Sequence, residues 1–129
     1  MERRAIEQLV QRWIQEGIAR GRLDVFDEPL APDVVDRSGP KPVNGVASFK
    51  ARAAGVQAAF GDIDVHVEEL VIGDGSIAWR WSLIGTHVGA FAGVAATGRR
   101  VTLRGVNFQR IADGKVTEHW TMVDVAGAL

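Results

Sequence analysis

The chain has no cysteine and no tyrosine, and it has only four prolines in 129 residues. Without cysteine there can be no disulfide and no thiolate metal site, a composition typical of the reducing cytoplasm, where we expect the protein to reside. No apolar run approaches the roughly 18 residues of a membrane-spanning helix. The first residues also lack the apolar core of a signal peptide. The sequence therefore predicts a protein that neither crosses nor binds a membrane.

The chain also has no excess of either charge sign. The chain carries 15 basic and 16 acidic residues, for a net charge of −1, and the two signs are scattered. This balance gives no basis for binding nucleic acid or an anionic lipid surface. Three histidines without metal-ligand spacing predict no metal site. The glycine-rich stretch lacks the strand–turn–helix context of a phosphate-binding loop, so we expect no cofactor.

Hydrophobic residues make up 47% of the chain, enough for one globular domain spanning residues 1–129. Their spacing of three and four predicts a first helix over about residues 6–18 and a second over about 46–60. After Gly61 the period changes to two, which predicts strands near 63–72, 77–84, 100–111 and 115–125. Gly73-Asp74-Gly75 and Asp113-Gly114 are turn sequences between these strands. The order indicates an α+β fold with N-terminal helices packed on a curved antiparallel sheet, leaving a cavity between the layers.

Unusual polar and aromatic residues concentrate in the C-terminal half. Their order is Arg80-Trp81, Gly85-Thr86-His87, Phe91-Ala92-Gly93, Thr97-Gly98-Arg99, Gly114-Lys115-Val116 and Glu118-His119-Trp120, followed by Asp124. Taken together, this ordered set resembles the SnoaL-like polyketide cyclase family. The resemblance implies the cone-shaped fold of the nuclear transport factor 2-like superfamily and a pocket for a small molecule.

The resemblance also identifies where this chain departs from the family's aldol cyclases. In those enzymes an aspartate two residues after the motif histidine acts as general acid/base, and a histidine on the preceding strand assists it. The matching positions here are Thr121 and Asn107. Neither side chain titrates near neutral pH, so we expect the usual cyclase mechanism not to operate.

Two other residues are the candidate catalytic groups. His119 lies in the last strand, either as a pocket acid/base or as a hydrogen-bonded core histidine. Asp124, flanked by valines, is either a buried carboxylate with a raised pKa or a group that caps the strand end or pairs with an arginine. The turn at 113–114 leaves the pairing of the last two strands open. A simple two-residue turn places Arg104 on the face of His119, and a one-residue bulge places Asn107 there.

Further residues are candidates for the pocket. Asp36 could reach the cavity mouth, although a role in a turn is the alternative. His87 could line the pocket or hydrogen-bond the following loop. The apolar candidates are Trp13, Phe49, Phe60, Trp81 and Phe91, for which core packing is the alternative.

Three functions remain open on the sequence. The first is a cofactor-independent enzyme that carries out acid/base chemistry on an apolar ring compound. The second is a non-catalytic binding protein for such a compound. The third is an interaction domain, because the aromatic strand at 77–83, with Trp79 and Trp81 on one face, predicts a homodimer formed through the sheet.

Overall fold

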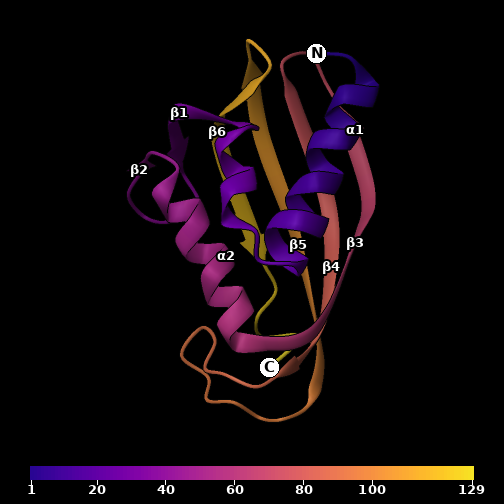
Figure 1. The fold of residues 1–129 in the computed structure, drawn as a ribbon, viewed down its shortest axis with the longest axis vertical. Coiled ribbons are helices and arrows are strands. Elements are labelled where there is room, and N and C mark those ends of the chain that lie inside the picture. The colour runs from indigo at the N-terminus through magenta and orange to yellow at the C-terminus, as the bar shows by residue number, and fades with distance from the viewer.

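The computed structural model describes all residues 1–129 and shows an α+β fold with helices on one face of a curved sheet (Figure 1). The elements in chain order are α1 (Arg3–Arg12), a π-helical continuation η1 (Trp13–Ala19), a short 3-10 helix η2 (Leu23–Asp27), β1 (Leu30–Asp36), β2 (Val43–Asn44), α2 (Ala47–Ala59), β3 (Phe60–Ile72), β4 (Ser76–His87), β5 (Arg100–Ala112) and β6 (Lys115–Val123). The expected fold class is confirmed. No helix is long and apolar enough to cross a membrane.

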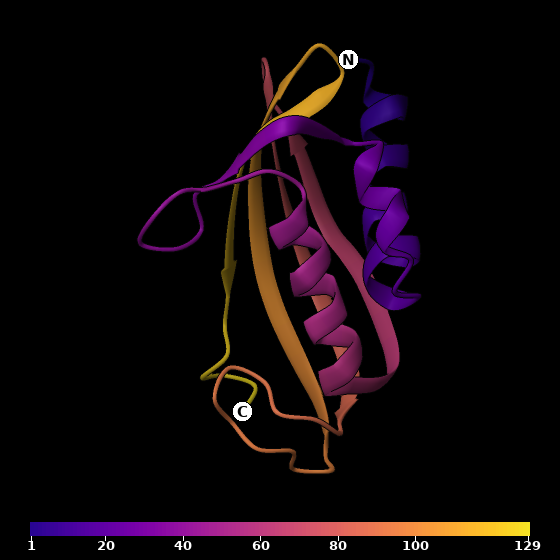
Figure 2. The same cartoon turned by 60° about the vertical axis from the view of Figure 1, so that its left-hand side comes forward.

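The sheet has six strands, two more than the four predicted after Gly61, in the order β2-β1-β6-β5-β4-β3. The additional strands come from the proline-containing segment before α2, where the sequence indicates only a brief strand around Val34 and Val35. All neighbouring pairs are antiparallel except β1 and β6, which run parallel. This parallel pair places Asp36, the last residue of β1, opposite His119 in β6. The sheet bends around α2, and α1 with η1 covers the neighbouring part of the same face (Figure 2).

The hairpin between β5 and β6 decides which residues share a face. Asp113 and Gly114 both have positive φ angles, of 52° and 74°, as a tight primed turn requires. The register then shifts by one residue between Arg110 and Ile111, so that Asn107 pairs with Thr121 and Gln109 pairs with His119. The bulged alternative is therefore the right one, and Arg104 points to the opposite face.

The core lies between the helices and the concave face of the sheet. Trp13 is at its centre, making edge-to-face contacts with Phe26, Phe49 and Trp79 at centroid distances of 5.2, 5.9 and 6.1 Å. Trp79 is buried in this core, and Trp81, two residues further along β4, also faces inward. The sequence-based reason for expecting a dimer was therefore wrong, because alternation places both tryptophans on the helix-covered face.

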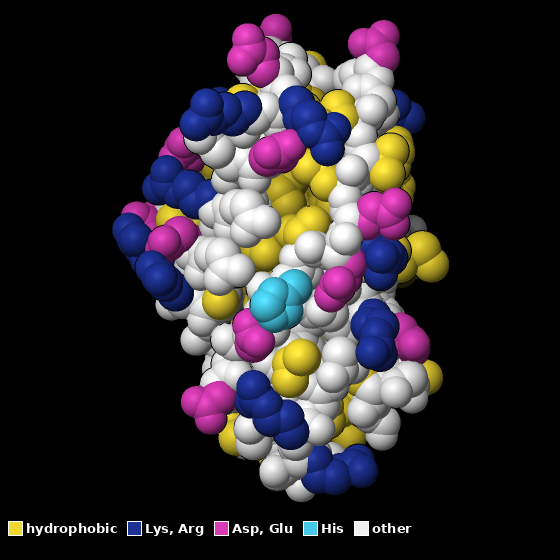
Figure 3. Space-filling model, turned by 90° about the vertical axis from the view of Figure 1, so that its right-hand side faces the viewer, with side chains coloured by type: hydrophobic (Ala, Val, Ile, Leu, Met, Phe, Trp, Pro, Cys, Tyr) yellow, Lys and Arg dark blue, Asp and Glu magenta, His cyan; other side chains and the backbone are white.

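The convex face of the sheet carries a different apolar group, which we call the outer patch: Val106, Phe108, Trp120 and Met122. These residues form two register pairs, and Met122 is 79% exposed. The guanidinium of Arg110 lies 5.6 Å from the Phe108 ring centroid and 5.9 Å from that of Trp120. On another side of the molecule, where α1 and β3 lie, charges of both signs surround a hollow with hydrophobic side chains (Figure 3).

Candidate functional site

A largely apolar cavity lies between η1, α2 and the concave face of the sheet. Its volume is about 120 Å³. An apolar cavity of about 150 Å³ can hold a benzene molecule, so this space corresponds to roughly one ring. The walls come from the helices and from the sheet, and include Ile14, Ile18, Val56, Val65, Leu83 and Leu103. Four polar side chains interrupt this lining: Arg52, Asn107, His119 and Thr121.

His119 sits at the polar end, with its ring stacked on Trp13 at 5.6 Å and in edge contact with Phe49 at 5.0 Å. A chain of hydrogen bonds fixes its tautomer. The indole N–H of Trp79 can only donate, and it donates to the side-chain oxygen of Gln109 at 3.1 Å. The amide nitrogen of Gln109 must then donate to Nδ1 of His119, 3.0 Å away. The proton of the neutral imidazole is therefore on Nε2, which no protein group binds.

Burial keeps His119 neutral. Removal from water lowers the pKa of its imidazole to about 4, the nearby Asp36 carboxylate opposes this shift, and the Arg52 guanidinium adds to it. At neutral pH the side chain therefore presents an N–H donor without a positive charge. A neutral imidazole of this kind can polarise a carbonyl group or donate a hydrogen bond to a developing oxyanion.

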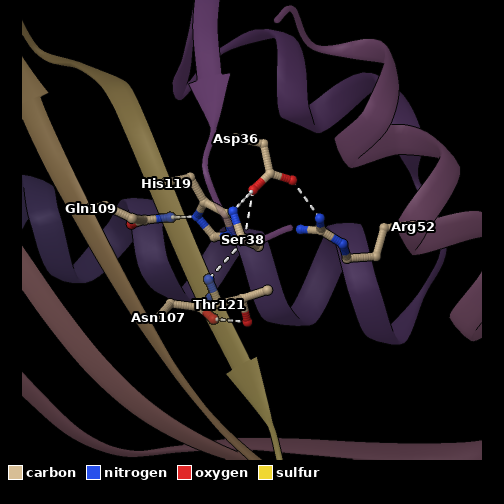
Figure 4. A network of polar contacts seen from close by, with 7 residues as sticks. All are labelled: Asp36, Ser38, Arg52, Asn107, Gln109, His119 and Thr121. Atoms are coloured by element: carbon tan, nitrogen blue, oxygen red, sulfur yellow. Dashed lines mark hydrogen bonds and ion pairs between the residues drawn. The ribbon is translucent and has the colours of Figure 1, made fainter. Parts of the chain in front are cut away.

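Asp36 lies beside His119 and is held in its charged form (Figure 4). Burial alone would raise the pKa of this carboxyl group. The hydroxyl and backbone N–H of Ser38, at 2.6 and 3.0 Å, and the guanidinium of Arg52 outweigh that effect and lower the pKa below its usual value. Ser38 also accepts a hydrogen bond from the backbone N–H of Thr121 at 2.8 Å, which ties the end of β1 to β6.

Asn107 is fixed by two donors. Its side-chain oxygen accepts hydrogen bonds from the indole N–H of Trp81 at 3.2 Å and from the hydroxyl of Thr121 at 2.6 Å. Gly105 makes room for this arrangement, since a Cβ there would lie 2.3 Å from the Trp81 ring. The amide nitrogen of Asn107 is consequently turned away from both partners.

The structure brings together most of the residues that the sequence suggested. Trp13, Phe49, Trp81, Phe91, Asn107, Thr121 and His119 all line the cavity. Asp36 reaches its polar end through Arg52 and the neighbouring His119 without lining the wall itself.

Four candidates lie elsewhere. Asp124 is exposed on the convex side and caps the turn after β6 by accepting the backbone N–H of Gly127 at 2.7 Å, so it is not a buried pocket carboxylate. Arg104 lies on the same convex side because of the bulge in the hairpin. Phe60 packs in the core against His87, at 5.6 Å. Nδ1 of His87 accepts the backbone N–H of Thr97 at 3.3 Å, which anchors the loop after β4.

Three residues of the site were not singled out from the sequence: Ser38, Arg52 and Gln109. Gln109 was the most accessible to prediction, because it alternates with Asn107 along β5. Arg52 is three residues after Phe49 and shares its helix face, yet surface arginines have the same spacing. Ser38 depends on the parallel pairing of β1 with β6, which no local pattern indicated. No group of three His, Asp or Glu side chains could hold a metal ion.

Fold and cavity together define a small cone-shaped protein with one pocket between helices and sheet. Comparison with known proteins makes the class specific. The chain belongs to the SnoaL-like polyketide cyclase family, whose sequence model matches residues 8–129.

Two curated relatives are similar over most of their length. The chain is 29% identical to aklanonic acid methyl ester cyclase DauD from Streptomyces sp. (strain C5), covering 92% of this chain and 76% of the relative. It is 30% identical to nogalonic acid methyl ester cyclase from Streptomyces nogalater, covering 84% of each. Among solved structures, TsrD from Streptomyces laurentii superimposes with a TM-score of 0.90 over 98% of this chain and 93% of that one. At 23% identity this likeness concerns the fold alone.

Proposed function

We propose that the protein binds a small ring compound in the cavity and catalyses a cofactor-independent proton transfer on it, with the neutral imidazole of His119 as the hydrogen-bond donor that stabilises the developing oxyanion. The observation that carries the proposal is that the neutral imidazole of His119 lines the cavity and that its tautomer directs the Nε2–H group away from Gln109. The apolar wall around it strengthens the hydrogen bond that it donates.

The chemistry follows from the position of that proton. An aldol-type ring closure begins when a carbon next to a carbonyl group loses a proton and negative charge develops on the carbonyl oxygen. Nε2–H of His119 would stabilise this oxygen, as a neutral histidine does in other enzymes. Thr121 cannot accept the carbon proton. A water molecule entering past Arg52, whose side chain is 41% exposed, would take it instead.

A simple ketone tests the proposal without knowledge of the physiological substrate. Acetophenone in D2O exchanges its methyl protons for deuterium when a catalyst promotes loss of the carbon proton, and NMR measures the rate. We expect the protein to accelerate the exchange and His119→Gln to reduce the acceleration by about 10²- to 10⁴-fold. Asp124→Asn is the matched control, because Asp124 lies outside the cavity, and it should leave the rate unchanged.

Two results would contradict the proposal in different ways. If His119→Gln exchanges acetophenone as fast as the unmodified protein does, the role of His119 as the donor to the oxyanion has been misassigned. If acetophenone binds but the unmodified protein does not accelerate the exchange, the cavity serves binding alone. A non-catalytic binding function is supported by one observation of its own. Asp36, the carboxylate beside the cavity, is already bound by Ser38 and Arg52, so it is not free to act as a base.

A further inference from the structure

The polar end of the cavity has an uneven supply of donors and acceptors, and Asn107 is the reason. An asparagine side chain has an oxygen that accepts and a nitrogen that donates, and either could face a ligand. Here the oxygen is occupied twice, by Trp81 and Thr121. The orientation cannot reverse, because the indole N–H of Trp81 has no lone pair to offer the amide nitrogen. Asn107 therefore presents its N–H donors to any ligand.

The other polar groups at this end have the same polarity. Nε2 of His119 carries a proton because Gln109 occupies Nδ1. Arg52 has only N–H groups, and its contact with Asp36 uses part of them. Asp36 is an acceptor, but Ser38 and Arg52 already bind its two oxygens. The hydroxyl oxygen of Thr121 retains lone pairs and is the one acceptor left among the lining side chains.

The net charge at this end is close to zero. Arg52 and Asp36 form an ion pair, and His119 is neutral at physiological pH. An anionic group would therefore lose its hydration without meeting an uncompensated positive charge, which is costly in an apolar cavity. A neutral oxygen that only accepts hydrogen bonds meets matching donors and loses little.

We infer that Asn107, locked by Trp81 and Thr121, is a specificity-determining residue that selects ring compounds carrying a neutral acceptor-only oxygen, such as a ketone or ester carbonyl, and disfavours analogues with an N–H donor at that place. The inference rests on the proposed ligand site and extends it, since it assigns the selection to a residue other than His119. A ligand N–H group facing the N–H group of Asn107 would leave both donors unpaired.

Three neutral probes of one ring size test it: acetophenone with a carbonyl, ethylbenzene with no polar group, and N-methylaniline with an N–H. Their dissociation constants can be measured by ligand-observed NMR or by quenching of the tryptophans that line the cavity. We expect acetophenone to bind about three- to tenfold more tightly than ethylbenzene, the difference that one hydrogen bond produces. N-methylaniline should bind more weakly than acetophenone by at least the same factor.

Asn107→Asp reverses the polarity of the site with almost no change of shape. Its carboxylate can still accept from Trp81 and Thr121, but the second oxygen replaces the donor. At pH 8 we expect N-methylaniline to bind this variant more tightly than acetophenone does. Asn44→Asp, on the exposed strand β2, introduces the same charge away from the cavity and should keep the original order.

Trp81→Phe gives an independent readout if Asn107→Asp does not fold. Removing the indole N–H frees the amide of Asn107 to reverse, so the preference for acetophenone over N-methylaniline should shrink. An unchanged preference in Trp81→Phe, or an unchanged order in a folded Asn107→Asp, would overturn the inference. If all three probes bind the unmodified protein equally, the inference fails and the ligand site stands. If none of them binds, the proposed function fails with it.

Discussion

Acid should destabilise this protein through His119, and the size of the effect can be worked out from its environment. In the folded protein burial lowers the pKa of the imidazole to about 4, whereas in the unfolded chain it is near the ordinary value of 6.5. Below pH 6.5 the unfolded chain therefore binds a proton that the folded protein does not. The contribution of the neutral His119 to the free energy of unfolding is complete above pH 6.5 and is lost as the pH decreases toward 4.

The magnitude follows from the difference between the two pKa values. Each unit corresponds to about 1.4 kcal/mol, so this one histidine should remove up to about 3 kcal/mol of the free energy of unfolding by pH 4. That is a substantial part of the 5–15 kcal/mol that stabilises a typical domain. Asp36 has the same sign but another range: its pKa is lowered from 3.8, so its contribution disappears only at still lower pH.

Urea unfolding followed by tryptophan fluorescence at pH 7.5, 6.5, 5.5 and 4 measures this dependence. His119→Gln is the informative variant, because a glutamine oxygen can accept the hydrogen bond from Gln109 and cannot take up a proton. We expect the unmodified protein to lose about 3 kcal/mol more than the variant between pH 7.5 and 4. Equal losses in the two proteins, or an NMR titration of His119 with a midpoint near 6.5, would refute the reasoning.

Three other outcomes are expected. Gly105→Ala should destabilise the protein by about 1–3 kcal/mol and weaken acetophenone binding, because the added methyl group displaces Trp81; unchanged melting and binding would contradict this. The unmodified protein should not cyclise aklanonic acid methyl ester, whereas Thr121→Asp combined with Asn107→His should gain activity; chromatography of the products decides, and turnover by the unmodified protein that Thr121→Ala does not diminish would show that the chemistry was misplaced. The outer patch should form a homodimer at micromolar concentration, and Phe108→Glu should dissociate it in sedimentation velocity; a monomeric unmodified protein would contradict this.

Period and turn chemistry were sufficient to predict the helices and the four long strands. The apolar stripe of the first helix and the alternation after Gly61 report burial directly, and burial is what forms these elements. Of the two strands before α2, only a brief strand near Val34 and Val35, within β1, could be predicted, and its partner could not. Their pairing depends on the distant strand β6, and proline residues interrupt the local pattern. The parallel pairing of β1 with β6, which the sequence did not predict, is also what brings Asp36 next to His119.

The candidate site was predicted best where one strand sets the direction of its side chains. His119 and Thr121 share a face because they are two positions apart in one strand, and their position in a cavity required only that this face meet the helices. Asn107 and Arg104 depended on the pairing between strands, which a single bulge near Arg110 reverses. Asp124 shows the limit of the local argument. Its valine neighbours suggested burial, but β6 ends at Val123, and beyond it the chain turns back so that the carboxylate binds a backbone N–H at the surface.

The chemistry of the site depends on a further step that no single position reveals. Gln109 and Asn107 are both amides, and a sequence cannot say which end of an amide faces a ligand. The tryptophans on β4 settle the matter, because Trp79 and Trp81 supply N–H groups that can only donate and so fix both amides with their oxygens toward β4. One amide then determines the tautomer of His119, and the other determines the polarity of the cavity. The two indole groups therefore leave N–H groups of His119 and Asn107 free to donate hydrogen bonds in the cavity.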